Sequence, residues 1–368
     1  MVLAFMGAEV VKVIAPGSRD SFDAIPFYLN NASKKSIELD LKSERGRATA
    51  LRLAARADVF VENFSPGTIE RLGLGYETLR NVNPRLIYAQ VKGFAAGSPY
   101  RDYPCFDPMA QAMSGASSVT GEPDGPPMKP GPDVADTGSG MVMASGILAA
   151  LYQREKDGLG QRVELAMTDH VATFLRIHYG WPIERGTATP RFGNQPPFLL
   201  TTAPSDIYPC RPFGPNDYVH IHCGSDRQWQ RMARVIGRED MLGDPRFATM
   251  ASRGEHKADV DKAVRAWTAT LDKLAAMRAL GAAGVPAGAV RTTAEVLADT
   301  DLRDRGIFVT VSHPARGELT IPGWPVQMSR SPARVAAPPE PGQHTGEVLR
   351  DWLGQADAAG GSPEPAGE

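Results

Sequence analysis

Short apolar runs alternate with amphipathic stretches of helical spacing along the first half of the chain. Strands are predicted at Val10–Ile14, Val59–Val61, Leu86–Val91 and Arg162–Met167, and Ser43–Arg56 is a predicted helix capped by Ser43. We expect the chain to open on the first of these strands. Strands that alternate with helices are typical of parallel sheets covered by crossover helices, so the pattern predicts an α/β protein.

The remainder of the chain predicts a second, smaller domain and a return to the first. Met141–Tyr152 is apolar on nearly every side, which predicts a buried helix threading the core. Residues 204–304 are mostly helical around a strand at Tyr218–Cys223, and Lys257–Leu280 has helical apolar spacing. We expect a large domain over 1–203, a small α+β domain over 204–304, and a return to the large domain over 305–353.

The return segment begins with a predicted hairpin, formed by Ile307–Val311 and Leu319–Ile321. A Pro-rich arm, Ser331–Pro341, and a short helix at Glu347–Trp352 follow. Residues 354–368 are Gly, Ala, Pro and Glu without an apolar period, and we expect them to be disordered.

Composition and charge narrow the class of protein. The 368 residues carry 40 basic and 42 acidic side chains, a formal charge of -2, so the chain has no general basic field for nucleic acid or anionic membrane. Three cysteines without a C-x-x-C spacing argue against a disulfide framework and a structural zinc site. The start of the chain has neither a basic leader nor a membrane-length apolar run. Small-molecule chemistry in a reducing cytoplasm is the expectation.

Six segments, in order, carry a resemblance to a known family. They are Gly7–Val13, Lys34–Lys42, Val61–Gly67, Asn83–Tyr88, Thr120–Pro127 and Asp136 with the Gly/Ser-rich start of the helix after it. Together they resemble the class III CoA-transferases, also called the CaiB/BaiF family, which includes formyl-CoA transferase, carnitine CoA-transferase and alpha-methylacyl-CoA racemase. The resemblance implies a Rossmann-like large domain built from both chain ends and an interlocked homodimer. It also implies that the family's first strand and helix lie upstream of Gly7 and are missing here.

Asp136 is the candidate catalytic residue. From the residues alone, a carboxylate at this helix start is ordinarily an N-cap. The resemblance instead implies a nucleophile that attacks an acyl-CoA thioester and forms an aspartyl anhydride and then an aspartyl-CoA thioester. Asp169 also follows a predicted strand, but the family's aspartate falls on Asp136, and we expect Asp169 to cap a helix and to line a wall at most.

The resemblance also implies which residues bind CoA. Leu39 and Leu41 run along the adenine, Lys42 meets phosphate, Asn63 and Phe64 flank the nucleotide, and Arg71 contacts phosphate. Solvated charges on helix faces are the ordinary interpretation of Lys42 and Arg71. The chain departs from the family at Ala15 and Pro104, two positions that correspond to cationic residues in family members. We therefore expect the nucleotide to be held differently or more weakly.

Residues near the reacting acyl group are also assigned by the resemblance. Gly193 and Asn194 lie in a segment that corresponds to a loop over the active site, although an interdomain turn is an equal alternative. Phe106 replaces the proton-shuttling histidine of the racemases, so a transferase is favoured, and Asp107 either lines the acyl pocket or caps a helix. The single glycine of the loop puts formyl and oxalate specificity in doubt.

Three other functions compete with a transferase. A racemase of the same fold and a non-catalytic CoA-binding protein remain alternatives, whereas a dinucleotide oxidoreductase is disfavoured because no G-x-G-x-x-G follows a strand. His220 and His222 share a strand face, but no third metal ligand is near in the sequence. We expect no metal, no cofactor besides CoA or acyl-CoA as substrate, small carboxylic acids as partners, and neither nucleic acid nor membrane.

Overall fold

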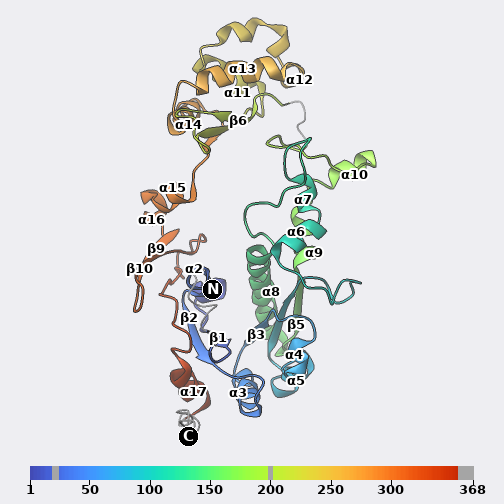
Figure 1. Cartoon of the computed structure of the whole chain (residues 1–368), viewed down its shortest axis with the longest axis vertical. Coiled ribbons are helices and arrows are strands. Elements are labelled where there is room, and N and C mark those ends of the chain that lie inside the picture. Colours follow the sequence, from blue (N-terminus) through green and yellow to red (C-terminus); the bar gives the residue numbers. More distant parts are fainter. Residues whose placement is uncertain (19–24, 198–201, 355–368) are drawn as a thin grey trace, which may run out of the picture. The chain divides into compact units, whose positions relative to one another are not determined.

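The computed structural model describes residues 1–18, 25–197 and 202–354, and they form two compact units (Figure 1). Unit 1 contains residues 1–114 and 130–174 and the described residues from 300 onward, while unit 2 contains residues 115–129 and the described part of 175–299. The predicted domain breaks at 203/204 and 304/305 differ from these bounds. The predicted disorder of residues 354–368 lies, apart from Gly354, outside the described residues.

Unit 1 contains two parallel sheets. Strand β1 (Val10–Ile14) pairs with β2 (Lys34–Glu38), and β4 (Ile87–Lys92) lies between β3 (Val59–Glu62) and β5 (Arg162–Ala166). All of these pairings are parallel, so the prediction of an α/β protein with parallel strands is confirmed. Parallel pairing brings the carboxyl ends of β3, β4 and β5 to one edge of their sheet.

Helices connect these strands and pack on them. Those of unit 1 are α1 (Val2–Phe5), α2 (Ile25–Asn31), α3 (Glu44–Ala54), α4 (Thr68–Arg71), α5 (Tyr76–Val82), α6 (Asp107–Met113), α8 (Asp136–Asp157), α9 (Met167–Phe174), α16 (Thr300–Asp304) and α17 (Thr345–Leu353). Ser43 caps α3 as predicted, because its side chain accepts a hydrogen bond from the Gly46 N–H. The expectation that the chain opens on a strand is wrong, since α1 precedes β1. Phe5 of α1 is buried, which explains why this apolar run folds as a helix against the core.

Helix α8 packs against β4 and β5, but it is not buried on all sides. Met143 and Ile147 are buried with Ala89 of β4, whereas Leu148 is 44% and Tyr152 67% exposed. The prediction of a buried helix that threads the core therefore holds for one face of α8 and is wrong for the other. The sheet covers only one face of the helix, so the apolar residues of the other face stay open in the single chain.

The C-terminal part of unit 1 returns to its beginning. Strands β9 (Phe308–His313) and β10 (Gly317–Pro322) form the predicted antiparallel hairpin. The Pro-rich arm runs past Ser33, whose backbone N–H donates to the Ala336 carbonyl. Val348 of α17 then packs with Ile37 and Leu39. Both ends of the chain therefore contribute to the core of unit 1.

Unit 2 is an antiparallel sheet with helices around it. The strands are β6 (Ser205–Pro209), β7 (Tyr218–His222) and β8 (Ala287–Ala289), with β7 in the middle. The helices are α7 (Ala116–Val119), α10 (Gly180–Arg185), α11 (Asp226–Val235), α12 (Met250–Glu255), α13 (Lys257–Thr268), α14 (Lys273–Ala282) and α15 (Thr293–Leu297), and the 3-10 helices are η2 (Glu239–Gly243) and η3 (Pro245–Phe247). The helical spacing predicted over 257–280 is divided between α13 and α14, because the Asp272 side chain caps α14.

No helix within the described ranges combines the length and the apolarity needed to cross a membrane.

Candidate active site

Asp136 is the first residue of α8, and the backbone N–H groups of the next three residues donate to the carbonyls of residues 133–135 in the preceding turn. The N-cap position is Ala135, and no side chain at that position makes a capping hydrogen bond. Asp136 therefore does not occupy the ordinary capping position, and the residue is exposed. A carboxylate at this end of a 22-residue helix lies in the positive field of the helix dipole.

Asp107 supplies the cap that Asp136 does not. Its Oδ1 accepts hydrogen bonds from the backbone N–H groups of Ala135 at 2.8 Å and Asp136 at 3.3 Å. The Gln111 side chain donates to the other oxygen, Oδ2, from the next turn of α6. Asp107 is only 4% exposed, so this buried carboxylate holds the backbone at the start of α8. Asp107 lies inside α6, after its N-cap residue Phe106, and it holds the start of α8 and not of its own helix. A role of Asp107 in lining the acyl pocket stays a prediction.

Two carboxylates and burial together change the proton affinity of Asp136. Partial burial of the carboxyl group, in a residue whose surface is otherwise exposed, is the first cause that raises the pKa of Asp136, and the negative charges of Asp107 and Asp133 raise it further. The pKa of the Cys105 thiol is raised by burial and then by the charge of Asp136, so this cysteine lies within electrostatic range of the candidate nucleophile. An Asp with a raised pKa is a stronger base and a better nucleophile once it is deprotonated.

His170 of α9 packs against the first turn of α8. A Cβ atom added to Gly138 would lie 2.4 Å from the His170 Nε2, so only glycine permits this approach. Burial lowers the pKa of His170, and a hydrogen bond to the Val134 backbone acts in the opposite direction. The segment Val134–Asp136 is thus held by Asp107 on α6 and by His170 on α9. The only sequence signal for this role of His170 is its place after a predicted strand.

The first group of predicted nucleotide residues follows β2. Leu39 is 8% exposed and packs in the core with Leu53 and Val348, while Leu41 is partly buried. Lys42 is exposed, and its backbone N–H donates to the Asp40 side chain. The Leu39 side chain is therefore occupied by the core. Contacts of Leu39, Leu41 and Lys42 with a nucleotide stay predictions.

The second group follows β3. Asn63 and Phe64 are both exposed, with 41% of Phe64 accessible, as a ring that receives a flat ligand must be. Arg71, at the end of α4, is exposed and donates to the Thr68 side chain. The residue before Asn63, Glu62, is buried, and its carboxylate accepts the Phe64 backbone N–H at 2.8 Å.

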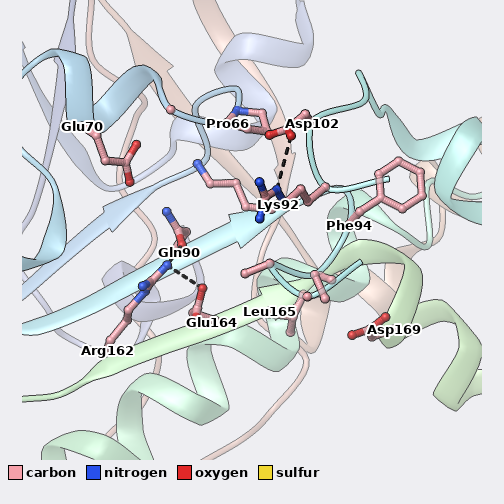
Figure 2. Close-up of a pocket in the computed structure, with 16 residues that line it drawn as sticks. Pro66, Glu70, Gln90, Lys92, Phe94, Asp102, Arg162, Glu164, Leu165 and Asp169 are labelled. Carbon is pink, nitrogen blue, oxygen red and sulfur yellow. Dashed lines mark hydrogen bonds and ion pairs between the residues drawn. The ribbon is translucent and has the colours of Figure 1, made fainter. Parts of the chain in front are cut away.

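A cavity of about 490 Å³ opens at the carboxyl ends of β3, β4 and β5 (Figure 2). Ligands of open parallel sheets bind at such edges. Basic and acidic side chains line it together: Lys92, Arg101, Arg162, Glu70, Asp102, Glu164 and Asp169. Sequence reasoning missed Lys92 and Arg101. A search for cations just after the predicted strands would have found Lys92, whereas Arg101 lies ten residues beyond the predicted strand Leu86–Val91.

Asp169 belongs to this cavity and not to a cap. It lies in the first turn of α9, inside the helix, so the prediction that it precedes and caps the helix is wrong. The prediction that it lines a wall is confirmed. Asp136, Asn63 and Phe64 are not among the residues that line this cavity.

Gly193 and Asn194 belong to unit 2. Gly193 has a φ of 57°, and a Cβ atom there would approach Glu122 Oε2 at 3.3 Å. The neighbouring Arg191 donates to the backbone carbonyls of Glu122 and Gly125, so this segment is tied to the loop that follows α7. Asn194 is exposed. Closure of this segment over a reacting centre stays a prediction.

Phe106, directly before α6, is 72% exposed. A phenyl ring has no ionisable group, so this residue cannot remove or return an α-proton as the racemases require. Within the described ranges, no three His, Cys, Asp or Glu side chains are grouped closely enough to hold a metal ion. His222 of β7 is hydrogen-bonded to Ser205 at 2.9 Å.

Comparison with known proteins identifies the family. The model of CoA-transferase family III matches residues 1–345. A formyl-CoA:oxalate CoA-transferase of Streptomyces avermitilis is 38% identical over 97% of this chain and 91% of its own length, and one of Rhodopseudomonas palustris is 36% identical over 97% and 89%. A solved CaiB/BaiF family protein of Brucella suis superposes with a TM-score of 0.85 and 29% identity, over 95% of this chain and 93% of that one. The chain therefore belongs to CoA-transferase family III and is an enzyme of that family.

Proposed function

We propose that this enzyme moves CoA from formyl-CoA, or a closely related acyl-CoA, to oxalate or another small dicarboxylic acid. The names of the relatives support this choice, since curated proteins that match 97% of the chain are formyl-CoA:oxalate CoA-transferases. The single glycine of residues 191–197, which argues against formyl and oxalate specificity, is a departure in one segment only. The acids remain a proposal because pocket side chains differ among proteins of one fold.

Asp136 is the proposed covalent carrier, and each step is a substitution at a carbonyl carbon. The Asp136 carboxylate attacks the thioester carbonyl, expels CoA thiolate and forms a mixed anhydride with the donor acyl group. The thiolate attacks the Asp136 carbonyl, releases the donor acid and leaves an Asp136–CoA thioester. The acceptor carboxylate attacks this thioester and expels the thiolate again, and the thiolate then attacks the acceptor carbonyl. Acyl-CoA of the acceptor leaves, and Asp136 is regenerated without any net use of water.

The observation that carries this proposal is the position of Asp136 at the N-terminus of α8 with a fixed backbone and a free side chain. The helix field stabilises the carboxylate that attacks and the oxyanions that develop beside it. Asp107 and His170 fix the Val134–Asp136 segment without using the Asp136 side chain. A side chain that served as the cap would not be available as a nucleophile.

We further propose that the enzyme works as a homodimer in the cytoplasm. The exposed face of α8 carries four apolar side chains of 43% to 67% exposure, which are Met141, Val142, Leu148 and Tyr152. Apolar patches of this kind are typical of surfaces that another protein covers. An interlocked arrangement of two chains is expected from the family and would cover such a face.

A transfer assay tests the proposed reaction. The purified protein is incubated with formyl-CoA and oxalate, and oxalyl-CoA is measured by chromatography, with succinate as a second acceptor. We expect oxalyl-CoA from the wild type and none above background from Asp136→Asn. Formation of the CoA thioester of succinate alone would show that succinate and not oxalate is an acceptor, and it would still support CoA transfer. Release of free CoA without any transfer would indicate hydrolysis of the thioester and contradict transfer, and CoA binding without any reaction would favour the non-catalytic alternative.

A further inference from the structure

A closed group of hydrogen bonds lies beside the predicted nucleotide residues. The Glu62 carboxylate oxygen Oε2 accepts the Phe64 backbone N–H at 2.8 Å and is ion-paired with Lys92 Nζ at 2.9 Å. The same Lys92 ammonium donates to the Phe64 carbonyl oxygen at 2.5 Å. Glu62 and Lys92 thus hold both the N–H and the carbonyl of one residue, Phe64.

The sheet register explains why these side chains meet. Glu62 of β3 lies opposite Gln90 of β4, and Gln90 lies opposite Glu164 of β5. Lys92 is two residues beyond Gln90, on the same face of the strand. Gln90 donates to the second Glu62 oxygen at 2.5 Å and accepts from Arg162 at 2.6 Å. Every oxygen of the Glu62 carboxylate therefore has a partner.

Burial makes this arrangement rigid. The Glu62 side chain is 0% exposed and that of Lys92 is 16% exposed. A buried carboxylate costs much free energy unless it is paired and hydrogen-bonded, and the Lys92 ammonium and the hydrogen bonds from Gln90 and Phe64 meet this requirement. The two residues that this group immobilises, Asn63 and Phe64, are exposed. The arrangement fixes a surface segment and leaves its side chains free for a ligand.

We propose that Glu62 and Lys92 are positioning residues for nucleotide binding, which they support by fixing the Phe64 backbone and thereby the direction of its ring. The inference rests on the proposed function, because it assumes that the Asn63–Phe64 segment contacts the nucleotide of CoA. A preorganised aromatic surface loses less conformational entropy when the ligand binds. Neither Glu62 nor Lys92 is among the groups that shift the pKa of Asp136, so we expect both to act on affinity and not on the chemical step.

Steady-state kinetics with two donors separate this role from a general loss of structure. Formyl-CoA carries the nucleotide, whereas formyl-pantetheine lacks it. For Glu62→Gln, we expect the KM for formyl-CoA to rise about tenfold, kcat to stay within twofold, and kcat/KM for formyl-pantetheine to stay unchanged. Equal losses with both donors, or an unchanged KM for formyl-CoA, would overturn the inference.

Two further variants sharpen the test. Glu77→Gln removes the same charge from the same unit, but Glu77 is 77% exposed, pairs with Arg80 and does not line the cavity beside Lys92. This variant should leave the KM for formyl-CoA within twofold of the wild type. A tenfold rise would show that loss of a negative charge alone explains the effect of Glu62→Gln, and would overturn the inference. If Glu62→Gln does not fold, the same kinetic comparison is made with Lys92→Gln, whose amide keeps a hydrogen-bond donor at this position. A wild type that does not bind CoA would instead refute the proposed function itself.

Discussion

The Asp107 side chain accepts a hydrogen bond from the backbone N–H of Asp136, the residue that we propose as nucleophile, at 3.3 Å. It accepts a shorter bond, 2.8 Å, from the N–H of Ala135, which is 0% exposed. One carboxylate therefore caps the helix while the neighbouring carboxylate stays available. This division of roles decides how substitutions at the two positions should differ.

Asp107→Ala should destabilise the protein. The buried N–H of Ala135 would lose its acceptor, and an unsatisfied buried donor costs about 1–3 kcal/mol. Asp107→Asn keeps an acceptor and should recover about half or more of that loss. Urea denaturation measures both variants, and an Asp107→Ala protein as stable as the wild type would show that the cap contributes nothing.

The acid limb of the transfer rate should respond to the charges near Asp136. The pKa of Asp136 is raised by burial, Asp107 and Asp133, and only the deprotonated carboxylate can attack, so the rate falls as the pH falls through this raised pKa. Asp133→Asn removes one of the negative charges and should move the acid limb to lower pH. A pH profile of kcat for the wild type and Asp133→Asn checks the sign, and a shift to higher pH would contradict it.

Gly138→Ala should be destabilising through one identifiable contact. The new Cβ would lie 2.4 Å from His170 Nε2, and overpacking of this kind costs about 1–3 kcal/mol. Substitution of His170 by Ala removes the obstructing ring, so the Gly138→Ala change should cost less in a His170→Ala background. Thermal melts of the two single variants and the double variant form the cycle, and strict additivity would rule out the contact.

Leu39 and Phe64 are both predicted to contact the nucleotide, but their substitution by Ala should have different effects on stability and on CoA binding. Leu39 is 8% exposed in the core, so Leu39→Ala should lower the free energy of unfolding by about 2–5 kcal/mol. Phe64 is 41% exposed, so Phe64→Ala should cost little stability and should weaken CoA binding. Urea denaturation and calorimetric titration with CoA distinguish the two residues. Strong binding of CoA by Phe64→Ala would remove Phe64 from the nucleotide site.

Unit 2 carries an ion pair with a clear pH signature. The pKa of Glu295 is lowered to about 2, first by the hydrogen bond from Lys273 and then by bonds at the start of α15. A depressed carboxylate pKa means that the stabilisation is present above the unfolded value of about 4.5 and is lost as the pH falls toward 2. Glu295→Gln should therefore approach the wild type in stability as the pH is lowered from 7 to 3.

Four strands of the parallel sheets could be predicted from the sequence because they are mainly apolar runs between polar turns, as Val10–Ile14 and Val59–Glu62 show. Strand β2 was missed, because Lys34–Glu38 has a single apolar residue, Ile37. The one-sided burial of α8 could not, because Met141 and Met143 are equally apolar and only the position of the sheet separates them. Likewise, the Ser43 cap is local and was predictable, whereas Asp107 caps a helix that begins 29 residues later. Local signals were sufficient only where the partner is near in sequence.

The most direct test of the central claim is the intact mass of the protein after exposure to formyl-CoA and to a panel of other acyl-CoAs. We predict a CoA-sized adduct that hydroxylamine removes, that is absent from Asp136→Asn, and that persists in Asp169→Asn, where the other carboxylate near a helix start is changed. An adduct that survives in Asp136→Asn, or the absence of any adduct from a folded wild type that turns over formyl-CoA, would contradict covalent transfer through Asp136.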